Sequence, residues 1–197
     1  SSPPPDGFFG VKCDVTDAEQ VDAAFKAIEE KFGPVEILVS NAGITKDTLL
    51  LRMSEADFSA VVDANLTAAF RVVKRASQGM LRARKGRIIL MSSVVGLLGS
   101  AGQANYAASK AGMLALARTL AGEVGADGIT VNCVAPGRIM TPMAAVAGDA
   151  QQHGVLLVGQ QLGAVAWGVQ QVAVAFAKGV VDFGHHGAQR AVGPVAV

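Results

Sequence analysis

Tyr106 and Lys110 stand at positions i and i+4, and Ser93 lies upstream of both. A Tyr and a Lys with this spacing lie on one face of a helix, one turn apart. A phenol is a weak acid with a reference pKa of about 10, and a neighbouring ammonium favours the phenolate and lowers that pKa. A hydroxyl from Ser93 could share the substrate oxygen. The three side chains therefore form a candidate general acid acting on a carbonyl or an alcohol.

By itself, the pattern YxxxK describes a surface Tyr and Lys on an ordinary helix, because it is short and common. Each neighbouring motif also has an ordinary alternative. Asn-Ala-Gly after a strand can be a turn, and an Asp at a helix start is favoured by the helix dipole. The helical Asn can be a satisfied core amide, and the Ser a strand-end hydroxyl. The acid hypothesis is preferred because these motifs occur together and in order: Asp14-Val15, Ser40-Asn41-Ala42-Gly43, Asn65, Ser93, Tyr106 with Lys110, and Pro136-Gly137 with Ile139 and Thr141.

The elements that must position these residues alternate between strands and helices. Apolar runs predict strands at 8–15, 35–39, 87–91 and 129–135. Capping signals at Thr16-Asp17-Ala18-Glu19 and at Ser54-Glu55-Ala56-Asp57 predict helix starts, and Gly33-Pro34 predicts the end of the first helix. This alternation indicates a parallel sheet with helices on both faces. The apolar stripes expected to face the core are Val21, Phe25, Ile28 and Phe32 on the first helix, and Phe58, Val62, Leu66, Phe70 and Val73 on the second.

In such sheets, ligands bind at the carboxyl ends of the strands, and the candidate residues gather there. Asp14 lies at the end of the first predicted strand, and Asn41 and Gly43 follow the second. Ser93 follows the third strand, and Pro136-Gly137 follows the fourth. We therefore expect one shared crevice.

Taken together, these motifs resemble the short-chain dehydrogenase/reductase family. The stretch 8–143 is similar to its 3-oxoacyl-[acyl-carrier-protein] reductase branch, through Ala64-Asn65-Leu66-Thr67 and Gln103-Ala104-Asn105-Tyr106. The resemblance implies an α/β fold with a Rossmann-like, doubly wound parallel sheet. It also implies NADPH-dependent reduction of an acyl-carrier-protein-linked 3-oxoacyl thioester to the 3-hydroxyacyl form in fatty acid biosynthesis, with NAD as the alternative cofactor. Rival functions are an acetoacetyl-CoA reductase, another short-chain alcohol dehydrogenase, or a catalytically inactive fragment.

The same resemblance implies a role for each motif residue. Tyr106 would donate the proton, Lys110 would lower its pKa and bind the nicotinamide ribose, and Ser93 would orient the carbonyl. Asn65 would hold a water that relays protons from Lys110. The cofactor-binding set would be Asp14 and Val15 near the adenine, Asn41, Ala42 and Gly43 on the adenosine side, Tyr106 and Lys110, Pro136 and Gly137, and Ile139 and Thr141 near the carboxamide and the adjoining phosphate.

Length and composition limit the classes of protein to which the chain can belong. The chain has 197 residues and a net charge of +1, so its length fits one domain and nothing global points to nucleic acid. Cys13 and Cys133, without a secretory signal, are expected to be buried free thiols in a reducing cytoplasm. His153, His185 and His186 show no metal-ligand spacing, so no metal is assigned. The stretch 150–177 lacks Asp, Glu, Lys and Arg, but its Gln and Gly residues argue against a membrane helix.

Two departures from the family pattern lead to further expectations. The family's Gly-rich turn and first two strands are not found before Phe8, and its ending is not found after Met143. We expect a partial domain over 1–143 and a tail over 144–197 that is frame-shifted or disordered. In the strand order 3-2-1-4-5-6, the strand 8–15 then has no partner and 35–39 has an open edge. We therefore expect the chain to bind NADPH weakly or not at all.

Two surface features suggest partners. A run of basic residues without Asp or Glu suits the docking of an acidic carrier protein, with a solvated helix face as the alternative. Small residues around Tyr106 allow another helix to approach closely, and the resemblance implies that this helix and the 54–84 helix pair across subunits of a homotetramer. The basic run comprises Arg71, Lys74, Arg75, Arg82, Arg84, Lys85 and Arg87.

Overall fold

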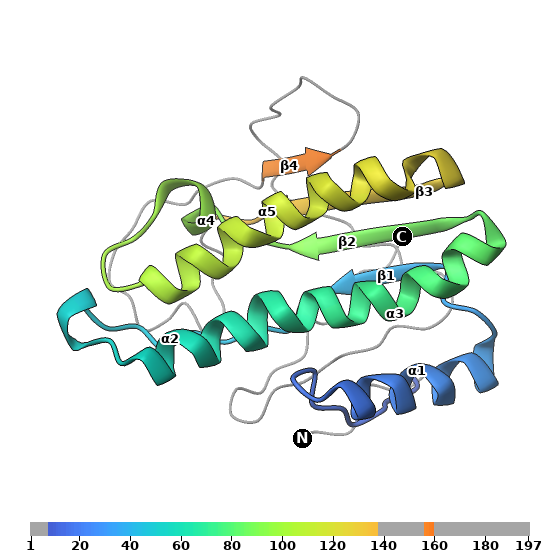
Figure 1. Cartoon of the computed structure of the whole chain (residues 1–197), viewed down its shortest axis with the longest axis horizontal. Helices are drawn as coiled ribbons and strands as arrows, with labels where there is room; N and C mark the ends of the chain where they lie inside the picture. The colour runs from blue at the N-terminus through green and yellow to red at the C-terminus, as the bar shows by residue number, and fades with distance from the viewer. Residues whose placement is uncertain (1–7, 138–155, 160–197) are drawn as a thin grey trace.

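The structure of the chain, a computed structural model, describes residues 8–137 and 156–159 (Figure 1). Its sheet has the order β1-β2-β3-β4, formed by Ile37–Ser40, Gly86–Met91, Ile129–Ala135 and Leu156–Gly159. The first three strands are parallel, and β4 runs antiparallel to β3. The helical elements are α1 (Ala18–Phe32), η1 (Leu50–Arg52), α2 (Glu55–Val62), η2 (Asp63–Thr67), α3 (Ala68–Ala83), α4 (Val95–Leu98), α5 (Ala104–Val124) and η3 (Gly125–Asp127).

Helices α3 and α5 lie against one face of β1, β2 and β3 (Figure 1). Leu38, Ile88 and Val131 point to this face and are buried, whereas Ile37 and Ile89 on the opposite face are half-exposed. The parallel Rossmann-like α/β arrangement predicted from the sequence is confirmed. Among the described residues, helices cover one face of the sheet.

The stretch 8–15 does not form the predicted strand. A strand is defined by its ladder of hydrogen bonds, and in the described part of the chain no neighbouring strand pairs with this stretch. Cys13 and Val15 are nevertheless buried in the core cluster. The side chains of Cys13 and Val15 therefore pack in the core although the backbone of 8–15 forms no regular secondary structure.

Helix α1 begins one residue later than the predicted capping box. Asp17, not Thr16, is the N-cap, and its carboxylate accepts from the N–H groups of Glu19 and Gln20. The helix ends at Gly33, which has a φ of 83° that a glycine adopts without strain. The stripe prediction holds except for its last member, because Phe32 is 42% exposed and stacks edge-on against Phe9.

The long second helix is interrupted by the π-turn η2. Ser54 caps α2 as predicted, accepting from the N–H of Asp57 at 3.0 Å. The predicted core stripe is wrong at its large members, since Phe58 and Phe70 are 40% and 46% exposed. Small side chains face the core instead, because they let this helix approach the sheet and α5 closely. The buried row includes Val61, Ala64, Ala68, Ala69, Val72, Val73, Ala76 and Met80.

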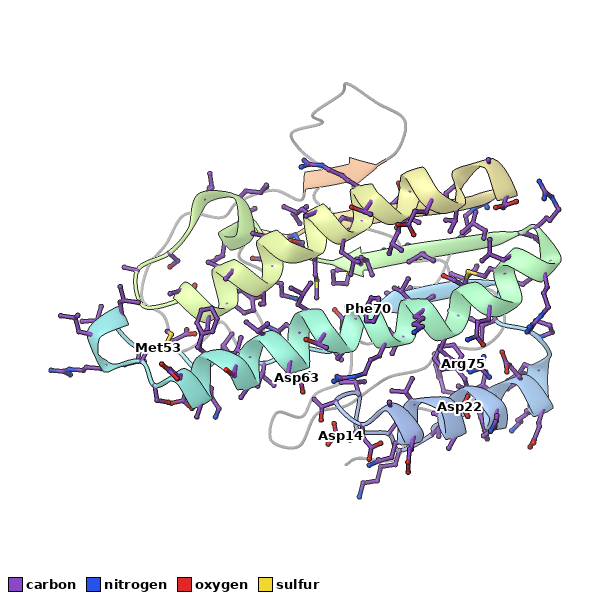
Figure 2. All side chains as sticks on the ribbon, viewed as in Figure 1. Asp14, Asp22, Met53, Asp63, Phe70 and Arg75 are labelled. Carbon is purple, nitrogen blue, oxygen red and sulfur yellow. The ribbon has the colours of Figure 1, made fainter. Side chains whose placement is uncertain are left out.

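Much of the basic run is neutralised within the fold. Arg75 joins α3 to α1 through Asp22 at 2.8 Å and Glu29 at 2.6 Å, and Figure 2 shows Arg75 beside Asp22. The other pairs are Arg71 with Asp63, Arg84 with Asp127, and Lys85 with Glu36.

The structure also shows the state of the cysteines, the grouping of possible metal ligands and the apolarity of the helices. Cys13 and Cys133 are free and buried. In residues 8–137 and 156–159, no three His, Cys, Asp or Glu side chains are grouped to hold a metal ion. The helices of these same ranges also include none with both the length and the apolarity of a bilayer-crossing segment.

Candidate active site

Two elements bring the three predicted side chains together. Tyr106 and Lys110 lie on the first turns of α5, and Ser93 lies in the loop that follows β2. The Ser93 hydroxyl stands beside the Tyr106 phenol, where it favours the phenolate. The ammonium Nζ of Lys110 lies 5.5 Å from the centre of the Tyr106 ring. The arrangement is thus the one that the i, i+4 spacing predicted.

Lys110 is held both by its ammonium group and by its main chain. Its Nζ donates to the main-chain oxygen of Met91 at 2.7 Å, and its own main-chain oxygen accepts from Ser92 Oγ at 2.7 Å. Only 4% of Lys110 is exposed, and this burial lowers its pKa from 10.5 to about 8. Ser92 was not predicted as a site residue, because nothing in a Ser-Ser pair tells which hydroxyl faces the helix.

The pKa of Tyr106 moves in the direction opposite to the one expected. Burial of the phenol raises its pKa above 10.0, and the neighbouring Ser93 hydroxyl opposes that rise. The expected lowering by Lys110 is wrong for this structure, because the ammonium is engaged with the Met91 oxygen and is itself partly neutral near pH 8. A protonated phenol is the form that a proton donor requires.

Asn65 sits in the π-turn and is fully buried. Its Oδ1 accepts from the N–H of Ile44 at 2.7 Å, and its Nδ2 donates to the Ile44 oxygen and to Ser109 Oγ, each at 3.0 Å. Both side-chain donors are therefore occupied. A water-holding role for Asn65 would have to use its main chain, where the π-turn replaces ordinary helical bonds with an i, i+5 bond from Ala68 to Asp63.

Gly43 lies where no side chain fits easily. A Cβ at this position would stand 3.0 Å from Asn65 Oδ1 and 3.6 Å from Lys110 Nζ. The glycine therefore keeps the backbone close to the two polar groups of the site.

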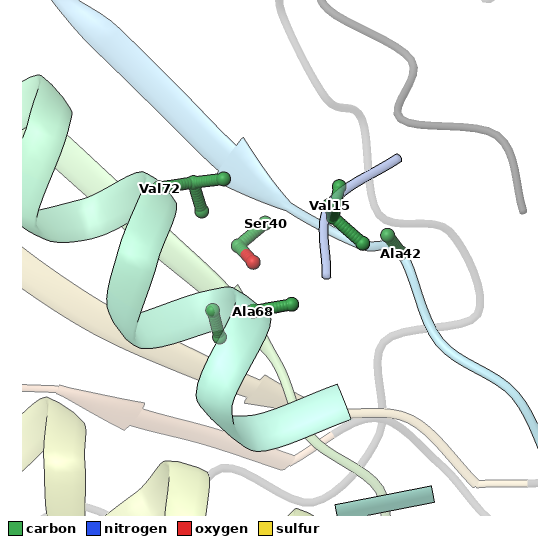
Figure 3. A pocket seen from close by; sticks show the side chains of 6 residues that line it. Val15, Ser40, Ala42, Ala68 and Val72 are labelled. Atoms are coloured by element: carbon green, nitrogen blue, oxygen red, sulfur yellow. The ribbon is translucent and has the colours of Figure 1, made fainter. Parts of the chain in front are cut away.

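Five of the predicted cofactor-binding residues follow the carboxyl ends of strands: Asn41, Ala42 and Gly43 come after β1, and Pro136 and Gly137 come after β3. Val15, Ser40 and Ala42 line a shallow hollow against α3 that has no room for a water molecule (Figure 3). By itself this hollow is therefore not a ligand pocket. Of the other predicted cofactor-binding residues, Asp14 and Asn41 are exposed. The main-chain oxygen of Pro136 accepts from the N–H of Val94, next to Ser93, and Gly137 follows Pro136 in the chain. Ile139 and Thr141 lie outside the described residues.

Comparison with known proteins decides the family. Residues 5–152 match the family model for the short chain dehydrogenase. The chain belongs to the short-chain dehydrogenase family. It is 53% identical over 152 residues to the 3-oxoacyl-[acyl-carrier-protein] reductase MabA of Mycobacterium avium, an alignment that covers 77% of this chain and 60% of the relative.

Other relatives in the short-chain dehydrogenase family carry the same reductase name. The 3-oxoacyl-[acyl-carrier-protein] reductases FabG of Vibrio cholerae and Escherichia coli are 49% and 46% identical over 147 residues, which cover 75% of this chain and 60% of each relative. The chain thus spans about 60% of the length of the relatives that it matches.

Asn105 is a further residue whose contribution only the structure shows. In the sequence, Asn105 belongs to the motif Gln103-Ala104-Asn105-Tyr106, one of those through which the chain resembles the reductase branch. In the fold it is fully buried, and its Nδ2 donates to the main-chain oxygen of Lys46 at 2.9 Å. It therefore ties the loop after β1 to the start of the helix that carries Tyr106.

In this short-chain dehydrogenase fold, Lys110 should make stability depend on pH. Its folded pKa of about 8 lies below the ordinary 10.5 of the unfolded chain, so the unfolded chain binds more protons between these values. Stability therefore rises with pH in this window, and we expect the free energy of unfolding to increase by about 1 kcal/mol from about pH 7 to pH 8.5. Cys13 and Cys133 oppose this weakly from about pH 8 and more strongly above pH 9, because burial raises their pKa values from 9.0 and the unfolded thiols lose their protons first.

Urea unfolding at the two pH values measures this change. Lys110→Met keeps the length of the side chain and removes its titration, so the variant should show no rise. An equal rise in the variant would assign the pH dependence to another group.

Proposed function

We propose that this chain is part of an NADPH-dependent reductase that converts a 3-oxoacyl thioester to its 3-hydroxyacyl form. The observation that carries the proposal is the buried Lys110, whose Nζ lies 5.5 Å from the centre of the Tyr106 ring, with the Ser93 hydroxyl beside the phenol. A neutral phenol and a hydroxyl directed at one point can bind and protonate a ketone oxygen. The names of the relatives support an acyl-carrier-protein-linked substrate.

When bound, the nicotinamide supplies the hydride, and the protein places the substrate and moves the proton. Ser93 orients the ketone oxygen, and Tyr106 donates its proton to that oxygen. Lys110, with a pKa of about 8, can give up a proton near neutral pH and so reprotonate the phenol. A water on the main chain at Asn65 would connect Lys110 to solvent.

The residues present fit the nicotinamide end of such a cofactor. Lys110 offers ammonium donors beside Tyr106, and Gly43 leaves room for close approach next to Asn65. Val15 and Ala42, which line the hollow near β1, would contact the adenine end. NADPH is proposed over NAD from the family resemblance alone. The free, buried thiols Cys13 and Cys133 support a cytoplasmic setting.

Two partners belong to the same proposal. Acyl carrier protein or acyl-CoA would present the substrate. Because much of the basic run is ion-paired, the long-range attraction would depend on Lys74, Arg82 and Arg87, which are exposed and have no ion pair with the described residues. A homotetramer is supported by Phe58 and Phe70, which α2 and α3 leave exposed.

The decisive assay mixes the purified chain with NADPH and acetoacetyl thioesters of carrier protein and of CoA. At NADPH concentrations high enough to offset the weak binding expected from the sequence, we expect NADPH oxidation that depends on the thioester and is faster with the carrier protein. Preference for CoA would favour the acetoacetyl-CoA reductase, and oxidation of simple secondary alcohols with NAD would favour an alcohol dehydrogenase. Thioester-independent oxidation, or none at saturating NADPH, would leave the inactive fragment as the better description.

A further inference from the structure

The end of β2 is fastened to the turn of α5 that carries Lys110 (Figure 1). Ser92 Oγ donates to the main-chain oxygen of Lys110 at 2.7 Å, and Lys110 Nζ donates to the Met91 oxygen at 2.7 Å. Gly96 packs against the same peptide group, where an added Cβ would stand 2.7 Å from the Lys110 carbonyl carbon. The loop that carries Ser93 therefore lies directly against the main chain of α5.

These contacts differ in how strictly they fix a distance. Lys110 has a flexible four-carbon stem, so its bond to Met91 tolerates a small shift of the helix. Ser92 has a short side chain, and the carbonyl that it contacts belongs to the backbone of α5. The main chain of Ser92 is held from the other side, because its N–H donates to the Val134 oxygen at 2.7 Å. Ser92 therefore sets the spacing between the sheet and α5 at this point.

This spacing decides where the hydroxyl of Ser93 stands. Ser93 follows Ser92 in the chain, so a shift of one moves the other. Tyr106 lies one turn before Lys110 on the same helix, and the Ser93 hydroxyl stands beside its phenol. Ser93 Oγ also accepts from the N–H of Val95 at 3.2 Å, which leaves its O–H to be donated. A misplacement of about 1 Å between such groups can cost about 10²-fold in rate.

We propose that Ser92 is a positioning residue, whose bond to the Lys110 main chain holds the Ser93 hydroxyl beside the Tyr106 phenol. This role rests on the proposed function, because it concerns the two groups that would bind the ketone oxygen. The Ser92 hydroxyl is engaged with the helix backbone, so it acts through Ser93. When that hydroxyl is removed, the Lys110 oxygen keeps its ordinary helical partner, so Ser92→Ala leaves this carbonyl paired and should fold.

Tyr106 reports the placement of Ser93, because it is the only tyrosine in the chain. The near-ultraviolet absorbance of the phenolate, followed against pH in the full chain, gives its titration midpoint without cofactor or turnover. Stopped-flow pH jumps record the absorbance before alkaline unfolding, which is slow in most small domains. Lys110, with a pKa of about 8, is neutral where the phenol titrates, and Asp47 keeps its charge in every variant.

Ser93→Ala should raise the midpoint by about one pH unit, because the phenolate loses a neighbouring donor. We expect Ser92→Ala to raise it by about half a pH unit, since Ser93 is then free to move away from the phenol. The double variant should match Ser93→Ala alone, because Ser92 acts only through Ser93. A wild-type midpoint in Ser92→Ala, or shifts that add in the double variant, would overturn the proposal.

Ser54→Ala is the matched control for the loss of a stabilising hydroxyl. Ser54 caps α2 by accepting from the N–H of Asp57 at 3.0 Å, so the variant loosens the fold without changing the loop after β2. It should keep the wild-type midpoint. An equal rise in Ser54→Ala would trace the shift to lower stability and would overturn the role of Ser92.

Turnover tests the consequence for catalysis. Ser92→Ala should lower kcat for a 3-oxoacyl thioester by about tenfold and leave KM for NADPH within about twofold, because only the alignment of the two hydroxyls changes. A wild-type kcat in Ser92→Ala would overturn the proposal. A wild-type chain without turnover would count against the proposed function, and the phenol titration would still decide whether Ser92 places Ser93.

Discussion

Tyr106→Phe is expected to lower kcat/KM for ketone reduction by about 10²–10⁴-fold, the usual contribution of a general acid. The variant keeps the ring that packs near Lys110 and removes only the hydroxyl that stands beside Ser93. Because the phenol is the proposed proton donor, the loss should appear in kcat as well as in kcat/KM. Steady-state consumption of NADPH with a 3-oxoacyl thioester measures both.

Ser100→Ala is a suitable control for this variant. It removes a hydroxyl from an exposed residue in the loop before α5 and should leave both constants unchanged. Circular dichroism and urea unfolding should show that Tyr106→Phe is folded. A variant that kept more than about a tenth of the wild-type rate would not fit a role for Tyr106 as the acid.

Gly96→Ala is expected to destabilise the fold by about 2–3 kcal/mol, because the added methyl overpacks a helix contact. A Cβ at Gly96 would stand 2.7 Å from the carbonyl carbon of Lys110 and 2.8 Å from the nitrogen of Ala111. Both atoms belong to the main chain of α5 and cannot rotate away. Helix α4 would have to move off α5, separating the Ser93 loop from Lys110, so activity should fall together with stability.

Gly122→Ala is the matched control, since it makes the same chemical change in α5 itself. Apart from the backbone of its own helix, no atom of the described residues lies within 4 Å of the Cβ that it adds, and alanine favours a helix over glycine by up to about 1 kcal/mol. Urea unfolding should therefore show changes of opposite sign for the two variants. A Gly96→Ala chain as stable as the wild type would mean that α4 and α5 pack less tightly than the structure shows.

The site and the fold were predictable from the sequence where short-range geometry decides them. The 3.6-residue period of a helix places Tyr106 and Lys110 on one face in any fold that keeps the helix. Ser54 and Gly33 mark helix ends because caps act within one turn. The carboxyl ends of parallel strands share one edge of a sheet, and this brought Ser93 to the same place.

Packing between distant segments decided the rest. The pKa of Tyr106 rises because neighbouring elements bury the phenol, and no spacing rule contains that burial. The stretch 8–15 lacks a ladder because a strand needs a partner from elsewhere in the sheet. The segment from α2 to α3 has apolar residues on two faces. The face with the smaller side chains packs against the sheet and α5, and the face with Phe58 and Phe70 remains exposed. Local periodicity identifies which residues share a face, but only the tertiary contacts determine what that face meets and how its charges titrate.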